Sequence, residues 1–306
     1  MSTSEKQNKT LTTKSTLRRF TEHVKNGNIE KIEKFFLKGL DPNFQCPDNR
    51  ETPLTLAATL RQPRHVIMVL TNGGARFDFT NTDGRTALHR AVEANNLEAL
   101  KTLLDLGASP NLKDNRKLTP LYYTVICGCD PQLTELLLQE YAVLGSADHQ
   151  GWQEVHQACK HGRVQHLELL LFYGADPNSR NASGNTPLHI CAVNEQKQCA
   201  KVLLSRGVDK NAMNYANQDP YQVAVIAGNL QMAEMIKNHK VNDVVPYRET
   251  PRFNTRGRPS SAVRGPEDDQ SGHGAEFFSP FVLPSSESTI SSKTSGKETG
   301  AEKKSK

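Results

Sequence analysis

The chain lacks any long hydrophobic run. No stretch of consecutive apolar residues exceeds five in the 306-residue sequence, whereas a membrane-spanning helix needs about 20. The first fourteen residues also lack the apolar segment of a secretory signal. These two absences exclude a membrane span and a secretory signal within this sequence, and we expect a cytoplasmic chain without membrane insertion.

Cysteine is scarce, and positive charge is not clustered. Six cysteines are too few for a disulfide scaffold, so reduced thiols are expected. The net charge of +5 divides into +2 from residues 1–14, +2 from residues 247–306, and a nearly neutral middle with 25 basic and 24 acidic side chains. A nucleic-acid binder needs grouped Lys and Arg to displace counterions from phosphates. No nucleic-acid partner is therefore predicted.

A tripeptide based on Thr-Pro-Leu recurs through the middle of the chain, with steps of 34, 33, 34, 33 and 33 residues. A second marker of the Gly-Ala-Asp kind precedes five of the six anchors in the same register. A 33-residue period with these two landmarks is typical of ankyrin repeats. The anchors are residues 52–54, 86–88, 119–121, 153–155, 186–188 and 219–221.

The landmarks predict the fold class. Thr at an N-cap accepts a hydrogen bond from the first helical turn, and Pro at the next position loses no bond because its missing N–H would be unpaired there. A glycine such as Gly207 suits the left-handed end of a second helix. Pairs such as Asp83-Gly84 tolerate positive φ, so hairpin-like fingers should project between repeats. The sequence thus predicts an all-α ankyrin-repeat solenoid.

The domain organisation follows from the repeat. A helix pair cannot cover its own apolar face and must stack on its neighbours, and we count about seven repeats in residues 15–246, with atypical caps at both ends. The last repeat ends in the polar segment 237–240. Residues 1–14 and the Ser/Gly/Pro-rich residues 247–306 are predicted to be disordered. Residues 276–284 form an apolar island in the tail, either a docking segment or a cluster without a partner.

Residues that depart from the ankyrin consensus point to one family. They lie in the segments 151–159, 164–176, 181–186 and 243–251. In these segments the chain resembles the Shank family of postsynaptic scaffolds, the SH3 and multiple ankyrin repeat domains proteins. The resemblance covers the ankyrin-repeat region alone, over roughly residues 15–251.

This resemblance implies a non-enzymatic scaffold or adaptor that binds spectrin-type cytoskeletal proteins and sharpin-like scaffold proteins. It also implies a location at the postsynaptic density or cell cortex. Because ankyrin repeats occur in many unrelated proteins, a generic regulatory subunit that binds and controls an enzyme stays open as the alternative. A monomer is expected.

No catalytic residue, cofactor or metal is predicted. Cys159 near His156 and the segment 127–129 look like ligand groups, but no second pair stands at the spacing of a zinc site. His156 occupies the landmark slot of His89 and His189, which should hydrogen-bond between neighbouring repeats. The sequence also contains no phosphate-binding glycine loop and no nucleophile elbow. Enzyme activity is therefore not expected.

Two columns of residues are candidates for partner binding. The finger slot before each anchor should line one edge of the solenoid, and it holds Trp152, the only tryptophan. Trp and Arg dominate interface hot spots, although Trp152 could instead pack over the next finger. On the concave face, the variable slot of the first helix is apolar in three of six repeats, which favours either a partner surface or tighter packing. The candidates are Arg85, Leu118, Tyr123, Ile126, Trp152, Lys160, Val193 and Ile226.

Overall fold

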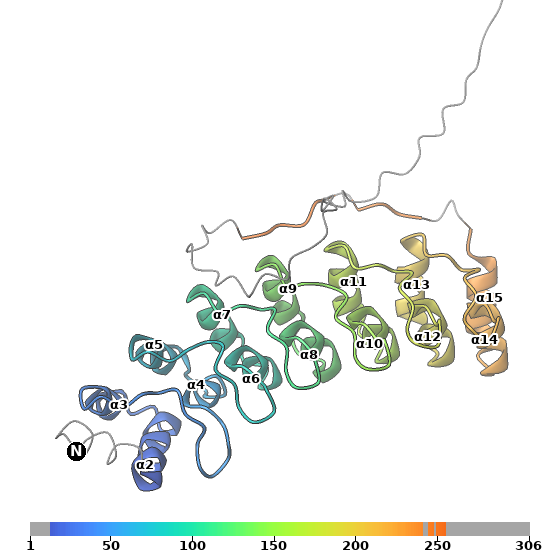
Figure 1. The fold of residues 1–306 in the computed structure, drawn as a ribbon. Helices are drawn as coiled ribbons and strands as arrows, with labels where there is room; N and C mark the ends of the chain where they lie inside the picture. Colours follow the sequence, from blue (N-terminus) through green and yellow to red (C-terminus); the bar gives the residue numbers. More distant parts are fainter. Residues whose placement is uncertain (1–12, 241–243, 248, 255–306) are drawn as a thin grey trace, which may run out of the picture. The chain divides into compact units, whose positions relative to one another are not determined.

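The computed structural model describes residues 13–240, 244–247 and 249–254. Regular structure in these ranges is entirely helical (Figure 1), so the all-α prediction is confirmed. None of the helices is long and apolar enough to cross a bilayer within the part of the chain described. The helices are α2 (Lys14–Lys25), α3 (Ile29–Phe36), α4 (Pro53–Ala57), α5 (Arg64–Asn72), α6 (Ala87–Glu93), α7 (Leu97–Asp105), α8 (Pro120–Cys127), α9 (Pro131–Gln139), α10 (Glu154–Lys160), α11 (Val164–Phe172), α12 (Pro187–Val193), α13 (Lys197–Ser205), α14 (Pro220–Ile226) and α15 (Leu230–Asn238).

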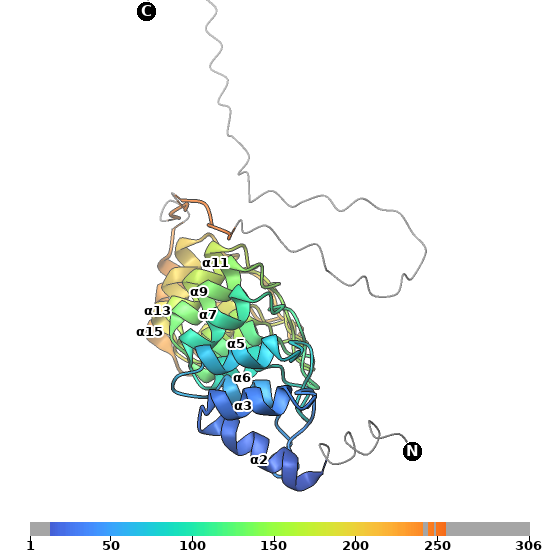
Figure 2. The ribbon, with the colours of Figure 1, turned by 90° about the vertical axis from the view of Figure 1, so that its left-hand side faces the viewer.

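The helices form antiparallel pairs that stack side by side, as the view along the row shows (Figure 2). The first helix of each pair, from α4 to α14, packs on the first helices of the neighbouring pairs, and the second helices form a parallel layer from α5 to α13. One leucine or valine per repeat lies buried where consecutive first helices meet, at positions 54, 88, 121, 155 and 188. The repeats therefore share one continuous apolar core.

The last helix pair exposes apolar side chains of its first helix. Tyr221 and Val225 of α14 occupy the slots of Leu188 and Ala192 in α12. Both α12 residues are fully buried because α14 covers them, whereas Tyr221 and Val225 are 37% and 41% exposed. The polar residues 237–240 lie at the end of α15 and leave this part of α14 uncovered. The first helix of the last pair therefore presents an open stacking face.

The chain makes contacts beyond residue 246, the predicted end of the folded region. Tyr247 packs against Phe172, and Phe253 packs against Tyr141 and Tyr173. Two aromatic side chains thus hold a segment whose composition predicts disorder. The apolar island 276–284 lies outside the described residues.

Candidate protein-interaction surface

The first helices and the fingers form one face of the repeat row, which we call the inner face. Every finger after the first is closed by an Asn or Asp at its base, as in Asp148, whose Oδ1 accepts hydrogen bonds from the amides of Gln150 and Trp152 at 2.9 Å each. Neighbouring fingers are also joined by their backbones, since the Ala182 amide donates to the Gln150 carbonyl at 3.0 Å. The inner face is therefore a fixed surface.

The landmark histidines join neighbouring repeats, as the sequence predicts. Nδ1 of His89 accepts the Thr86 amide at 3.2 Å, and Nε2 lies 3.1 Å from the Leu118 carbonyl of the next finger. Because Nδ1 accepts, the proton sits on Nε2 and is donated to that carbonyl. His156 and His189 repeat the arrangement, and burial lowers the pKa of all three imidazoles. These neutral histidines therefore have a structural role, because each connects its repeat to the next.

The cysteines divide by exposure. Cys159 and Cys191 are fully buried in first helices, and burial raises the pKa of both thiols. Cys127 is exposed at the end of α8, where a hydrogen bond with Cys129 lowers its pKa. Within residues 13–240, 244–247 and 249–254, no group of three or more His, Cys, Asp or Glu side chains is placed to hold a metal ion. Cys127 is thus the thiol most available for chemical labelling among these residues.

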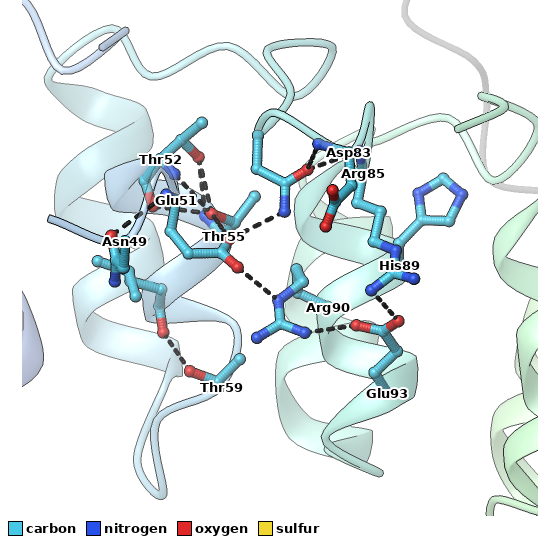
Figure 3. Close-up of polar contacts among 12 residues, drawn as sticks. Asn49, Glu51, Thr52, Thr55, Thr59, Asp83, Arg85, His89, Arg90 and Glu93 are labelled. Atoms are coloured by element: carbon cyan, nitrogen blue, oxygen red, sulfur yellow. Dashed lines mark hydrogen bonds and ion pairs between the residues drawn. The ribbon is translucent and has the colours of Figure 1, made fainter. Parts of the chain in front are cut away.

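Four charged side chains form an ion-pair network at the first fingers and α6 (Figure 3). Glu93 lies between two guanidinium groups: its Oε1 is 2.5 Å from Nη1 of Arg85, and its Oε2 pairs with Arg90. Arg90 also lies 3.3 Å from Oε1 of Glu51. The four side chains are only 15% to 27% exposed, so water screens them less than it screens surface pairs. Two carboxylates balance two guanidinium groups in this network. Arg85 is therefore engaged in an ion pair within the chain.

Loss of the central carboxylate should destabilise this network. Glu93→Gln leaves the partly buried guanidiniums of Arg85 and Arg90 with Glu51 as their one acid in the network, and we expect unfolding to require about 1 to 3 kcal/mol less. Urea unfolding followed by circular dichroism measures the loss. Asp78→Asn is the matched control, because Asp78 pairs with Arg76 on an exposed surface and should shift the midpoint little. Equal shifts in both variants would contradict the role of the network.

Two of the candidate binding residues are buried, contrary to the prediction from the sequence. Leu118 occupies a finger slot but is only 5% exposed, because its side chain joins the core. Tyr123 is equally buried, and its hydroxyl donates to Oδ2 of Asp114 at 2.6 Å. Burial raises the pKa of Tyr123 to about 12. Arg85 covers the ring of Tyr123 at 5.1 Å, so neither Leu118 nor Tyr123 is available as an anchor on this face.

Trp152 and Lys160, predicted from two different columns, lie together. The ammonium of Lys160 is 5.2 Å from the centre of the Trp152 ring, and the ring meets His156 edge to face. Trp152 is partly buried and packs against the core, as in the packing alternative, while one part of the ring remains accessible. Its finger slot and the variable slot of α10 therefore form a single aromatic and cationic feature.

The exposed apolar side chains of the inner face gather at α12 and α14. Val193 and Ile226 are 52% and 70% exposed, whereas Ile126 is partly buried against the core. Tyr221, Val225 and Ile226 line an open hollow of about 380 Å³. The prediction from the sequence omitted Tyr221 and Val225, although an aromatic residue in a slot otherwise filled by Leu or Val was a usable signal. The inner face thus changes from ionic at α6 to apolar at α14.

Similarity to known proteins shows which class of protein this chain belongs to. The family described as "Ankyrin repeats (3 copies)" matches residues 20–114, 106–181 and 155–246, and the chain belongs to this ankyrin-repeat family. The crystal structure of the ankyrin repeat domain of Bcl-3 aligns with a TM-score of 0.64 and 25% identity, over 70% of this chain and 97% of that chain.

The particular similarity is to the Shank proteins, as the off-consensus residues indicated. The chain is 55% identical over 263 residues to human SH3 and multiple ankyrin repeat domains protein 2, which covers 86% of this chain and 14% of the relative. It is 48% identical over 254 residues to mouse SH3 and multiple ankyrin repeat domains protein 1, covering 83% and 12%. The chain therefore spans 14% and 12% of the length of these two relatives.

Proposed function

We propose that this chain is a non-enzymatic adaptor whose inner face binds protein partners. The observation that carries the proposal is the pair of exposed apolar side chains at Val193 and Ile226 on the inner face, next to the open stacking face formed by Tyr221 and Val225. Apolar groups gathered on a rigid face leave water only when a partner covers them, and such patches commonly mark interaction sites. Ankyrin repeats use extended surfaces of this kind for binding.

The similarity to Shank proteins supports a more specific proposal. Partners would be spectrin-type cytoskeletal proteins or sharpin-like scaffold proteins, and the protein would act at the postsynaptic density or cell cortex. Trp152 with Lys160 would supply a central anchor, since a partly buried tryptophan beside a cation suits an interface core. The apolar end of the inner face would supply most of the apolar surface that loses contact with water when a partner binds.

Binding should depend on the apolar end of the inner face. Val193→Asp or Ile226→Asp in the full chain is expected to weaken binding of a purified spectrin-repeat fragment or a sharpin-like protein at least tenfold, because each places a charge in a desolvated contact. Calorimetric titration measures the affinity. Both side chains are more than half exposed, so unfolding should change little.

Leu37→Asp is the matched control, because Leu37 is an 87% exposed apolar residue after α3, at the other end of the row. Equal losses for Leu37→Asp and Ile226→Asp would remove the support for the inner face. Affinity capture that returned a kinase or phosphatase, and neither partner class, would favour the regulatory-subunit alternative.

A further inference from the structure

The chain turns back after α15 and lies across the second helices, on a surface separate from the inner face (Figure 1). We call residues 244–254 the strap; the structure describes all of them except residue 248. The Val245 amide donates to the Ser205 carbonyl at 2.7 Å, beside the end of α13. The Asn254 amide donates to the Gln139 carbonyl of α9 at 3.0 Å. The strap therefore crosses the ends of α13, α11 and α9.

Tyr247 makes the first side-chain contact of the strap. The Arg206 guanidinium lies 3.5 Å from the centre of the Tyr247 ring, and Phe172 meets the same ring edge to face at 5.2 Å. Arg206 also donates to the Val245 carbonyl at 2.7 Å. A cation above an aromatic face and a ring at its edge select an aromatic side chain at this position.

Phe253 makes the second contact, six residues later. Its ring stacks on Tyr141 at 5.0 Å and meets Tyr173 edge to face at 5.5 Å. The Tyr173 hydroxyl donates to the Arg252 carbonyl at 3.1 Å, which fixes the backbone beside the ring. We call Tyr141, Phe172, Tyr173 and Arg206 the docking row.

Tyr141 occupies a conformation that favours glycine. Its φ is +61°, and the equivalent position in other repeats is Gly107, Gly174 or Gly207, each also with positive φ. A tyrosine there is strained, because its Cβ crowds the backbone. The ring of Tyr141, at this strained position, is the one on which Phe253 stacks. A strained residue in contact with a bound segment is typical of a binding site.

The strap leaves much of this surface open. Tyr247 and Phe253 remain 38% and 42% exposed, so each is only partly desolvated. An open hollow of about 460 Å³ adjoins Tyr247 between α9 and α11, with Glu135, Glu168 and Phe172 in its lining. The surface beside the strap thus offers space and acidic groups that the strap does not fill.

We propose that the docking row binds an extended, basic segment of another protein that carries two aromatic side chains six residues apart. The strap is the resident competitor and shows the chemistry: aromatic rings at 247 and 253, extended backbone, and two arginines against one glutamate in its sequence. Its covalent link gives it a high effective concentration, so a partner must bind more tightly or fill the hollow as well. This surface is additional to the inner face of the proposed function.

The test uses the full chain with the strap unlatched by Tyr247→Ala and Phe253→Ala. The probe is a fluorescein-labelled synthetic peptide of residues 244–254, measured by fluorescence anisotropy. We expect binding in the micromolar range by the unlatched chain and at least tenfold weaker binding by the wild type, whose own strap competes. A peptide with its second aromatic residue moved by two positions should bind at least tenfold more weakly. No binding by the unlatched chain, or indifference to the spacing, would overturn the proposal.

Tyr141→Gly in the unlatched chain separates binding from folding. The change removes the left-handed strain, so the melting temperature should rise, while the peptide loses its stacking partner and binds at least fivefold more weakly. Unchanged peptide binding in this variant would overturn the proposal that the docking row is the binding site. Light scattering on the wild type that gave a dimer would assign the occupant to the strap of a second copy instead. Binding of the inner-face partner should be the same in the unlatched chain, so failure of one proposal does not imply failure of the other.

Discussion

Replacing His89 by alanine should destabilise the protein by about 2 kcal/mol. The imidazole caps α6 by accepting the Thr86 amide and donates to the Leu118 carbonyl of the next repeat. Loss of an N-terminal cap costs about 0.5 to 2 kcal/mol. Loss of the bond to Leu118 adds about 0.5 to 1.5 kcal/mol, because the Leu118 carbonyl still accepts the Asp114 amide at 3.0 Å. Urea unfolding followed by circular dichroism gives the value.

His89→Gln is the matched control, because the chain already carries a glutamine in this slot in its last repeat. In the last repeat, Gln222 takes the same slot, and its Oε1 accepts the Asp219 amide at 3.0 Å. Glutamine should therefore keep the cap at position 89 and lose only part of the contact with Leu118, at about 1 kcal/mol. If glutamine and alanine were equally harmful, the capping bond would not be the cause.

The same histidines set a pH dependence. Burial lowers the pKa of His89, His156 and His189 below the value of about 6.5 that they have in an unfolded chain. Below pH 6.5 the unfolded chain binds more protons, so the stability from these residues is complete above that pH and falls as the pH falls. Glu154 opposes this trend, because burial raises its pKa to about 7 and its protonation below that pH stabilises the folded chain. Because His89→Gln removes one of the three histidines, acidification from pH 7 to 5 should destabilise this variant less than it destabilises the wild type, as urea unfolding at the two pH values measures.

Replacing Gly84 by alanine should cost about 3 kcal/mol. Gly84 lies at the tip of a finger with φ of +74°, which disfavours any side chain by about 1 to 2 kcal/mol. An added Cβ would in addition lie 2.7 Å from the Asn115 backbone nitrogen of the next finger. That amide donates to the Asp83 carbonyl at 3.1 Å, so relief of the clash would break a bond between repeats. Thermal unfolding by circular dichroism measures the effect.

Gly107→Ala separates the two causes. Gly107 has φ of +93°, but apart from its two chain neighbours no residue would have a heavy atom within 4 Å of a Cβ added there. Only the backbone strain applies at this position, and we expect a loss of about 1 kcal/mol. Similar losses at Gly84 and Gly107 would mean that the packing of finger against finger contributes little.

The repeat architecture could be predicted from local residue patterns alone. A Thr N-cap, a proline at the first helical position and a glycine at the helix end act within a few residues, so their spacing defines each helix wherever the chain goes. The landmark histidines could be assigned for the same reason, because His89, His156 and His189 occupy one slot of the repeat and each lies against the next finger. The burial of Cys159 and Cys191 likewise followed from their slot in the first helix.

Which residues of the predicted columns face solvent depends instead on the packed structure. Equivalent slots hold Leu118, whose apolar side chain enters the core, and Arg85, which Glu93 retains. Tyr221 is exposed because α14 has no further helix pair on it in the described structure, a fact that no local pattern records. The strap depends on ring contacts between residues about 80 to 110 positions apart, such as Phe253 with Tyr173 and Tyr141. Local rules define helices, whereas burial and long-range pairing depend on what packs against them.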